Sequence, residues 1–247
     1  MSNVTDEFSR RQFVAKAGAV AVAMTVPVLA EQTQDKQPGG PQSQEPEVTA
    51  TEDLMREHGV LRRALLVYHE TVPKLRQNAS KIDPRALHQT ADLFRVFGEE
   101  YHEKMLEEQH IFPVVRKMKG EAAKYPDILV LQHNRGREIT GYILTVTNRA
   151  KIGAGSAEPL ACAFESMVRM YQHHAAREDT IVFPAWKENF TQKQIDEFSD
   201  QFEDIEQKMF GKDGFEDAEH KIGGIEQALG LADIAQFTAP LPPNHRG

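Results

Sequence analysis

The apolar residues of this chain recur at intervals of three and four from Thr51 to about residue 189, which is the period of an α-helix. No run of alternating apolar and polar residues indicates a strand in this stretch. Turn-forming residues interrupt the pattern at Asp83-Pro84, between residues 120 and 126, and in the sequence KIGAGSAEP. We therefore predict four helices joined by short connections, which favours an all-α, up-down four-helix bundle within residues 51–190. The four predicted helices cover about residues 51–78, 84–118, 126–150 and 157–189.

The residues after the predicted bundle continue the helical pattern. Apolar side chains again follow one another at steps of three and four, at Ile195, Phe198, Phe202, Ile205 and Met209. We predict an additional C-terminal helix that docks against the bundle, within an extension that covers residues 191–235. The last residues, 236–247, include TAPLPPNHRG and are predicted to form a loose tail.

The N-terminal segment has the features of a transport signal. Arg10 and Arg11 precede an apolar run from Phe13 to Val28, and a small residue, Ala30, follows shortly after. The run is shorter than the roughly 20 apolar residues that a membrane-spanning helix needs, so an uncleaved membrane anchor is the less favoured alternative to a cleaved signal. Residues 31–50 are rich in Gln, Pro and Gly without apolar periodicity, so we predict a disordered linker there.

This segment resembles a twin-arginine (Tat) signal, whose Ser-Arg-Arg-x-Phe core is matched by Ser9, Arg10, Arg11 and Phe13. The resemblance implies that residues 1–30 direct export of an already folded protein and are then removed near Ala30. The expected location is the periplasm or another exported location, with no stable membrane insertion after the signal is removed.

Composition limits the kinds of partner and cofactor. The net charge is -8 and the isoelectric point is near 5.7, so no basic stripe is available to neutralise phosphates, and we expect no nucleic-acid partner. Cys162 is the single cysteine, which excludes an intramolecular disulfide and a thiolate-rich metal site. Any metal site must therefore use His and carboxylate ligands.

Each of the four predicted helices places one His on or beside its apolar face. At about 100° per residue, His58, His133 and His174 lie within the apolar stripes of their helices, and His102 lies at the edge of its stripe. Glu178 follows His174 by one turn and shares its side of the helix. The neighbouring His173 points well away from that face.

Two segments of the chain, YHEKMLEEQHIFP and HHAAREDTIVFP, end in the same Phe-Pro pair. Glu107 and Glu178 each lie six residues before the Pro of their segment, but His102 lies one position further from its Pro than His174 does. A regular α-helix would place His102 and Glu107 about 140° apart. A single π-bulge would absorb the additional residue and bring both side chains onto one face. We therefore predict His102 and Glu107 as a pair, with Glu108, which lies nearer the core without the bulge, and Glu103 as alternatives.

The remaining prominent residues receive structural interpretations. We expect Pro113 and Pro184 to kink their helices beyond the His and Glu pairs. Core packing is the main role expected of the three tyrosines Tyr68, Tyr101 and Tyr171, although one of them is a candidate hydrogen-bond donor to the site. Among the other histidines, His110 is a candidate for a supporting position around the site, whereas structural or solvated roles are expected for His69, His88, His220 and His245.

The six inward ionisable side chains favour a metal site over a plain core. Burial of even one unpaired carboxylate costs several kcal/mol, and a dinuclear cation would convert that cost into coordination. His and carboxylate ligands without sulfur favour iron or manganese over structural zinc. The predicted metal ligands are His58, His102, Glu107, His133, His174 and Glu178.

These residues and their order resemble the hemerythrin-like, or HHE cation-binding, proteins over about residues 50–190. The resemblance rests on four segments that contain these ligands, REHGVLRR, YHEKMLEEQHIFP, LQHNRGR and HHAAREDTIVFP. It implies an up-down four-helix bundle around a non-haem di-iron centre, in which the four His are terminal ligands and Glu107 and Glu178 bridge the two ions. Iron is the expected metal, and manganese or zinc is less expected.

One position departs from the family pattern. Oxygen-carrying hemerythrins have a second His on the third helix, one turn after the first, and Arg137 stands at that position here. The resemblance therefore implies at most four His and two Glu ligands, with an open coordination position. Reversible oxygen carriage does not follow from it.

The sequence supports functions of more than one class. The leading prediction is an exported non-haem di-iron protein that binds or senses a small diatomic ligand, oxygen or nitric oxide, or holds iron. The alternatives are a di-iron redox enzyme that reduces peroxide or repairs iron centres, and a metal-free helical interaction module. Ferritin-like oxidases need Glu-x-x-His on two helices, and this chain has that spacing only in the second, at Glu99 to His102 and Glu107 to His110. Binding is favoured over catalysis, and the sequence does not identify a redox partner.

Overall fold

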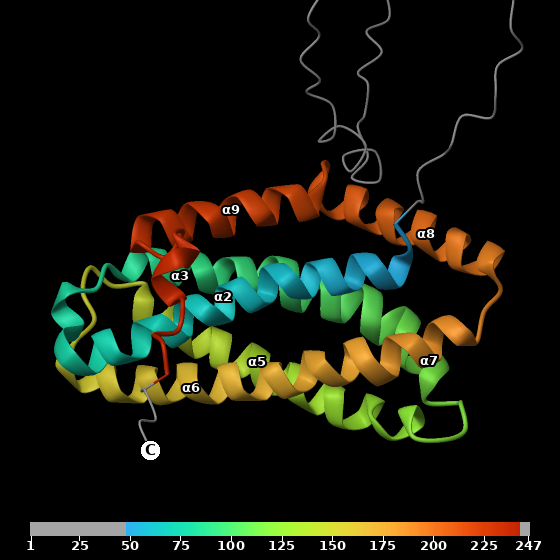
Figure 1. Ribbon diagram of the computed structural model, residues 1–247, viewed down its shortest axis with the longest axis horizontal. Coiled ribbons are helices and arrows are strands. Elements are labelled where there is room, and N and C mark those ends of the chain that lie inside the picture. Colours follow the sequence, from blue (N-terminus) through green and yellow to red (C-terminus); the bar gives the residue numbers. More distant parts are fainter. Residues whose placement is uncertain (1–47, 243–247) are drawn as a thin grey trace, which may run out of the picture. The chain divides into compact units, whose positions relative to one another are not determined.

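The structure is a computed structural model that describes residues 48–242. The predicted signal, almost all of the predicted linker, and residues 243–247 with His245 lie outside these described residues. Within them all regular secondary structure is helical, and four long helical rods run up and down beside one another (Figure 1). The predicted all-α bundle is therefore confirmed.

The first two rods join at a short turn. The first is α2 (Ala50–Asn78), followed by the single 3₁₀ turn η2 (Ala79–Lys81). The second rod begins as α3 (Pro84–Leu93), continues as the π-helical segment η3 (Phe94–Ile111), and ends as α4 (Phe112–Val115). Asp83 starts this rod, because its Oδ1 accepts a hydrogen bond from the Arg85 amide at 2.9 Å and Pro84 fits the first helical position.

The third and fourth rods complete the bundle. The third is α5 (Pro126–Thr147), preceded by the 3₁₀ turn η4 (Ala122–Lys124). The fourth consists of α6 (Ala154–Arg177), the short π-helical segment η5 (Glu178–Val182) and α7 (Phe183–Glu188). All four rods end within about three residues of the predicted boundaries, which is close to the uncertainty of helix ends.

The π-helical backbone occurs in two rods rather than in one. The second rod contains the expected π geometry, over a longer stretch than a single bulge, and the fourth rod contains a short π segment that was not predicted. In each, the amide of the Phe in the Phe-Pro pair donates to the carbonyl five residues earlier, from Phe112 to Glu107 and from Phe183 to Glu178. The shared Glu-to-Phe-Pro spacing of the two segments therefore corresponds to a shared wide turn at the Glu.

The C-terminal extension contains two helices where one was predicted, α8 (Gln192–Phe210) and α9 (Gly214–Leu229). The first ends at Gly211, whose φ of 67° favours glycine, and Asp213 caps the second through the Glu216 amide at 2.8 Å. A last 3₁₀ turn, η6 (Ile234–Phe237), follows. The second helix was missed because glycines 223 and 224 interrupt its apolar pattern.

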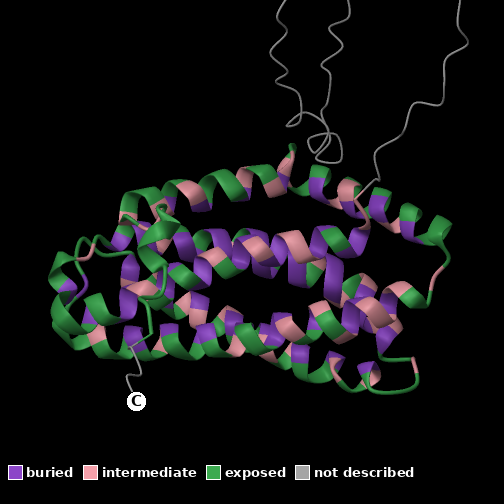
Figure 2. Ribbon diagram, viewed as in Figure 1, coloured by how far each residue is buried: buried purple, intermediate pink, exposed green. Residues whose placement is uncertain are grey.

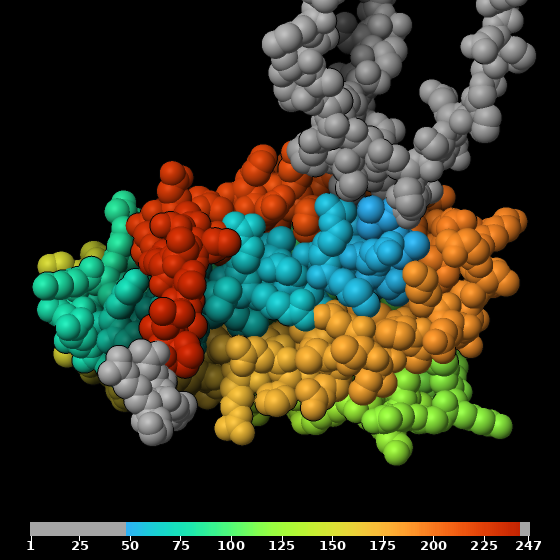
Figure 3. Space-filling model, viewed as in Figure 1, coloured from blue at the N-terminus to red at the C-terminus, as the bar shows by residue number. Residues whose placement is uncertain are grey.

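The C-terminal helices cover one side of α2 (Figure 3). Glu226 of α9 pairs with Arg63 of α2 at 2.6 Å, and Ser199 Oγ of α8 accepts a hydrogen bond from the Ala50 amide at 2.9 Å. Ile222 and Ile225 of α9 join the hydrophobic core. The predicted docking of the extension against the bundle is therefore confirmed.

Burial is concentrated on the faces that the rods turn toward one another, and α2 is the helix with the most buried residues (Figure 2). Large aromatic side chains fill this interior, and Tyr68 stacks on Phe164 with ring centroids 4.3 Å apart. Among residues 48–242, no helix is both long and apolar enough to cross a membrane. The interior is interrupted by one concentration of buried polar side chains.

Candidate metal centre

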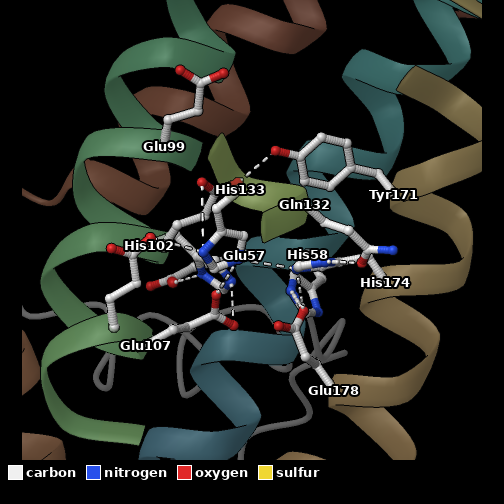
Figure 4. Close-up of polar contacts among 12 residues, drawn as sticks. Glu57, His58, Glu99, His102, Glu107, Gln132, His133, Tyr171, His174 and Glu178 are labelled. Atoms are coloured by element: carbon white, nitrogen blue, oxygen red, sulfur yellow. Dashed lines mark hydrogen bonds and ion pairs between the residues drawn. The ribbon is translucent and has the colours of Figure 1, made fainter. Parts of the chain in front are cut away.

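The structure brings together four His, one from each rod of the bundle (Figure 4). His58 comes from α2, His102 from η3, His133 from α5 and His174 from α6, and none is more than 3% exposed. They form two neighbouring pairs, because the rings of His58 and His102 lie 4.6 Å apart and those of His133 and His174 lie 4.8 Å apart. Each ring turns its Nε2 atom toward the centre of the cluster and its Nδ1 atom outward.

Glu107 lies between the two His pairs. Its Oε1 is 3.3 Å from His102 Nε2, and its Oε2 is 3.3 Å from His133 Nε2. This spacing, with one oxygen for each pair, is what a carboxylate that bridges two metal ions requires. The π-helical backbone of η3 makes the arrangement possible, because it brings residues five apart, His102 and Glu107, onto one face.

Glu178 faces both pairs from the opposite rod. Its Oε2 is 3.0 Å from His174 Nε2 and 3.5 Å from His58 Nε2. The six predicted ligands therefore converge in one buried cluster. Two sets of ligand atoms share Glu107, and within each set the atoms lie within 4.8 Å of one another: one set adds His58 and His102, and the other adds His133, His174 and Glu178.

A second layer of acceptors fixes the orientation of the four imidazole rings. The outward Nδ1 atoms lie 2.7 Å from Asp179 for His58, 2.7 Å from Glu57 for His102, 2.9 Å from Glu108 for His133 and 2.9 Å from Gln132 for His174. An acceptor at Nδ1 holds the proton there and leaves the Nε2 lone pair for a metal ion.

These four acceptors follow a cyclic rule. Each one is the sequence neighbour of a predicted ligand on one rod and serves the His of the next rod. Glu57 precedes His58, Glu108 follows Glu107, Gln132 precedes His133, and Asp179 follows Glu178. Sequence reasoning did not assign these roles, although a polar residue directly beside each inward ligand was the available signal.

The Phe of each Phe-Pro pair also contacts a ligand on the next rod. Phe112 stacks on His133 and Phe183 stacks on His58, each with ring centroids 5.5 Å apart. Both phenylalanines are buried, and their rings limit the rotation of the two imidazoles. The two similar segments of the sequence thus have the same roles, because each supplies one inward Glu and one Phe that packs on a His of another rod.

The His and Glu side chains of the cluster shift the pKa values of one another. Although burial opposes a charged imidazole, the carboxylates of Glu103, Glu107 and Glu108 raise the pKa of His133 to about 10. Burial likewise opposes charge on His102, yet Glu107 and Glu57 raise its pKa. Despite its complete burial, Glu107 has a lowered pKa because His102 and His133 favour its ionised form. The carboxylate therefore requires positive charge beside it.

The cluster passes a test of fit for two cations. Within residues 48–242, both oxygens of Glu107 and of Glu178, together with His102 Nε2, are buried and have no hydrogen-bond partner. Buried polar atoms are rarely left in this state. These five atoms belong to three of the six side chains that face the middle of the cluster, which is the position where a pair of metal ions would satisfy them.

Three carboxylates of the second rod were candidates for the metal ligand, and their contacts in the structure differ. Glu107 is the one that contacts Nε2 atoms of two His. Glu108 Oε1 lies 2.6 Å from Arg137, and Glu103 Oε2 lies 3.3 Å from the same guanidinium. Arg137 therefore supplies positive charge to both outer carboxylates. It stands at the position where oxygen-carrying hemerythrins have a second His on the third helix.

Two tyrosines donate hydrogen bonds to carboxylates around the cluster. The Tyr101 hydroxyl donates to Glu57 at 3.2 Å, and the Tyr171 hydroxyl donates to Glu103 at 2.7 Å. Tyr68 instead packs in the core.

The other histidines within residues 48–242 lie away from the cluster. His69, His173 and His220 are exposed, and His88 bonds Thr147 at 3.0 Å. His110, the candidate for a supporting position, instead packs against Phe202 of α8. It contributes to docking of the C-terminal extension.

An all-α bundle with a buried cluster of four His and two Glu defines a candidate cation-binding protein. The family model of the hemerythrin HHE cation binding domain matches residues 49–186. This chain therefore belongs to the hemerythrin HHE cation-binding family, and the family resemblance predicted from the sequence is confirmed.

The chain is also similar to uncharacterized proteins of Mycobacterium bovis and of two strains of Mycobacterium tuberculosis. Each is 40% identical over 196 residues, which covers 79% of this chain and 76% of the relative. The similarity thus extends beyond the 138 residues of the matched domain, from 49 to 186 inclusive. No solved structure matches the chain significantly.

Proposed function

We propose that this protein is an exported non-haem di-iron protein that binds or senses a small diatomic ligand, oxygen or nitric oxide, or holds iron. The observation that carries the proposal is the position of Glu107 and Glu178, each of which faces His side chains of both pairs. Iron suits a mixed set of imidazole and carboxylate ligands, and binds small ligands when a coordination position is open.

The residues divide into two groups with different tasks. His58 and His102 would hold one ion, His133 and His174 the other, and Glu107 and Glu178 would contact both. The Nδ1 acceptors keep each ring turned inward, so that no ligand has to reorient when a metal ion binds. Manganese and zinc remain less favoured occupants of the same ligands.

A small cavity beside the cluster supports the binding of an external ligand. His58, His102 and His174 line it together with Leu61, Tyr171 and Glu103. The space for the centre of a water-sized molecule is about 10 Å³, which corresponds to one small molecule. A ligand of two heavy atoms, such as oxygen, nitric oxide or peroxide, is closer to this size than an organic substrate is.

Two alternatives receive different support. The polar pair Glu103 and Tyr171 at the cavity favours the redox enzyme that acts on peroxide as the second candidate, because both groups can exchange hydrogen bonds with a protonated ligand. The metal-free interaction module would leave the buried oxygens of Glu107 and Glu178 without partners.

Ligand binding is tested with protein that has been loaded anaerobically with ferrous iron. Addition of oxygen or nitric oxide should change the near-ultraviolet and visible absorption, and the change should saturate at a fixed ratio of ligand to chain. An absorption spectrum that neither ligand alters would contradict binding and sensing and leave iron storage as the function.

A further inference from the structure

The cavity beside the cluster is not uniformly apolar. Leu61 and Leu65 form part of its lining, but Tyr171 and Glu103 line it as well, and the Tyr171 hydroxyl donates a hydrogen bond of 2.7 Å to Glu103 Oε1. Both polar side chains are almost fully buried, at 4% and 2% exposure. We infer that Tyr171 and Glu103 form a hydrogen-bonding wall that selects a ligand able to donate and accept hydrogen bonds, such as hydrogen peroxide, over an aprotic one such as nitric oxide.

The inference rests on the di-iron centre of the proposed function, and it favours the second candidate for that centre, reaction with peroxide, over a diatomic ligand. The first observation that supports the inference is the space beside Gly136, which the Tyr171 hydroxyl occupies. A Cβ atom added at Gly136 would lie 2.0 Å from the Tyr171 hydroxyl oxygen and 2.9 Å from its Cζ. Any other residue at position 136 would therefore displace the ring, so Gly136 on α5 allows the hydroxyl to reach its position.

The second support is the cost of placing Glu103 there. Burial of a carboxylate is unfavourable unless its charge and its hydrogen-bond capacity are both met. Arg137 lies 3.3 Å from Glu103 Oε2, yet within residues 48–242 this oxygen accepts no hydrogen bond. Arg137 does not need Glu103 for its own neutralisation, because it also pairs with Glu108 at 2.6 Å. Glu103 thus keeps unused acceptor capacity within the protein.

Packing alone does not account for the tyrosine. Its ring contacts Phe94 at 4.9 Å and His174 at 5.4 Å between centroids, and a phenylalanine would make the same ring contacts. Among residues 48–242, the hydroxyl adds only the hydrogen bond to Glu103. Tyr171 and Glu103 are therefore matched as donor and acceptor at the wall of a cavity that admits one small molecule, next to three predicted metal ligands.

The test uses iron-loaded full-length protein and two ligands, with hydrogen peroxide added to the oxidised form and nitric oxide to the reduced form. The concentration for half-saturation of the spectral change is measured, normalised to bound iron, for wild type, Tyr171→Phe, Glu103→Gln and Gly136→Ala. We expect about a tenfold weaker response to peroxide in each variant, equivalent to about 1.4 kcal/mol, with less than a twofold change for nitric oxide.

Matched controls separate this role from a loss of packing. Tyr68→Phe removes a buried hydroxyl elsewhere in the core, and Gly141→Ala adds a methyl group on the same helix as Gly136, at ordinary contact distance from Arg95. Both should leave the two half-saturation concentrations unchanged. Melting temperature and iron content are recorded for every variant, so that a folding defect is visible, and Tyr171→Phe is the mildest of the three changes.

The outcomes are distinct. If Tyr171→Phe and Glu103→Gln respond to peroxide as wild type does, or lose affinity for both ligands equally, the hydrogen-bonding wall is wrong and the proposed function is unaffected. If wild-type protein binds iron but neither ligand alters its spectrum, ligand binding itself fails. If wild-type protein binds no iron, the di-iron proposal fails as a whole.

Discussion

The Nε2 atoms of His133 and His174 lie 3.1 Å apart in the buried centre of the bundle. Each ring also has its Nδ1 atom 2.9 Å from an oxygen acceptor, which holds a proton on that side. Two unprotonated nitrogens would then direct their lone pairs at one another, so a cation or an additional proton has to lie near them. A metal ion on this pair, shared with Glu107 and Glu178, resolves the conflict.

Loss of a predicted ligand on the fourth rod should weaken the whole centre. Glu178→Ala and His174→Ala should each lower iron content and abolish the iron-dependent absorption. They should also remove the metal-dependent part of the thermal stability, which for metal at 100 times its dissociation constant is about 2.7 kcal/mol, or several degrees in melting temperature.

His173 provides the matched control for these two variants. It is adjacent to His174 but exposed, so His173→Ala should leave absorption and melting temperature nearly unchanged. The opposite pattern, in which His173→Ala removes the absorption and His174→Ala retains it, would show that the assigned side of the helix is wrong.

Removal of an outer acceptor should reduce metal affinity without removing a ligand. Gln132→Leu leaves His174 in place but takes away the oxygen at its Nδ1, so the ring loses its fixed orientation. We expect metal to bind 10-fold to 100-fold more weakly, as judged by competition with a chelator. Gln109→Leu changes an exposed glutamine of η3 and should have no effect. Equal affinities for wild type and Gln132→Leu would argue against the cyclic arrangement of acceptors.

The pH dependence of stability should contain a contribution from Glu99. Its complete burial raises the pKa from an ordinary 4.5 to about 7. Between these values the folded state retains a proton that the unfolded state has lost, so this group makes the protein less stable as pH rises from about 4.5 to 7. Glu99→Gln should remove that loss and gain up to about 3 kcal/mol relative to wild type across this window.

Denaturant unfolding of both proteins at pH 4.5 and pH 8 measures the difference. Glu100→Gln, a change at the exposed neighbour, should follow wild type at both pH values. A stability difference between wild type and Glu99→Gln that is the same at both pH values would mean that Glu99 has an ordinary pKa in the folded protein.

The proposed export depends on the N-terminal arginine pair. Replacement of both Arg10 and Arg11 by Lys should leave the uncleaved precursor in the cytoplasm of an exporting host, because the Tat pathway reads the pair. Wild-type protein should be exported and shortened near Ala30, as measured by fractionation and mass spectrometry. Normal export of the double variant would rule out the Tat assignment.

Much of this architecture could be predicted from the sequence because each rod buries a regular apolar stripe. His58 and His133 lie on the same helical faces as the core residues Leu54 and Leu129. The apolar periodicity therefore predicted both the rods and the inward His side chains. The pairing of His102 with Glu107 needed one additional step, since only a π-type turn brings residues five apart together.

What could not be predicted depends on local backbone geometry or on contacts between rods. The wide turn at Glu178 was not predicted, because His174 and Glu178, four apart, already share a face in an ordinary α-helix and need no bulge to meet. The bond between His174 and Gln132 joins two helices and has no periodic signature. The division of α8 from α9 depends on one left-handed glycine, Gly211, within a polar stretch.

The iron content of the purified protein tests the central claim most directly. Wild-type protein loaded anaerobically with ferrous iron and freed of excess metal should contain close to two iron atoms per chain by elemental analysis, because two sets of ligands share Glu107. The same measurement on protein from its exporting host identifies the metal that is loaded there. Fewer than about half an atom of iron per loaded chain would contradict the di-iron centre.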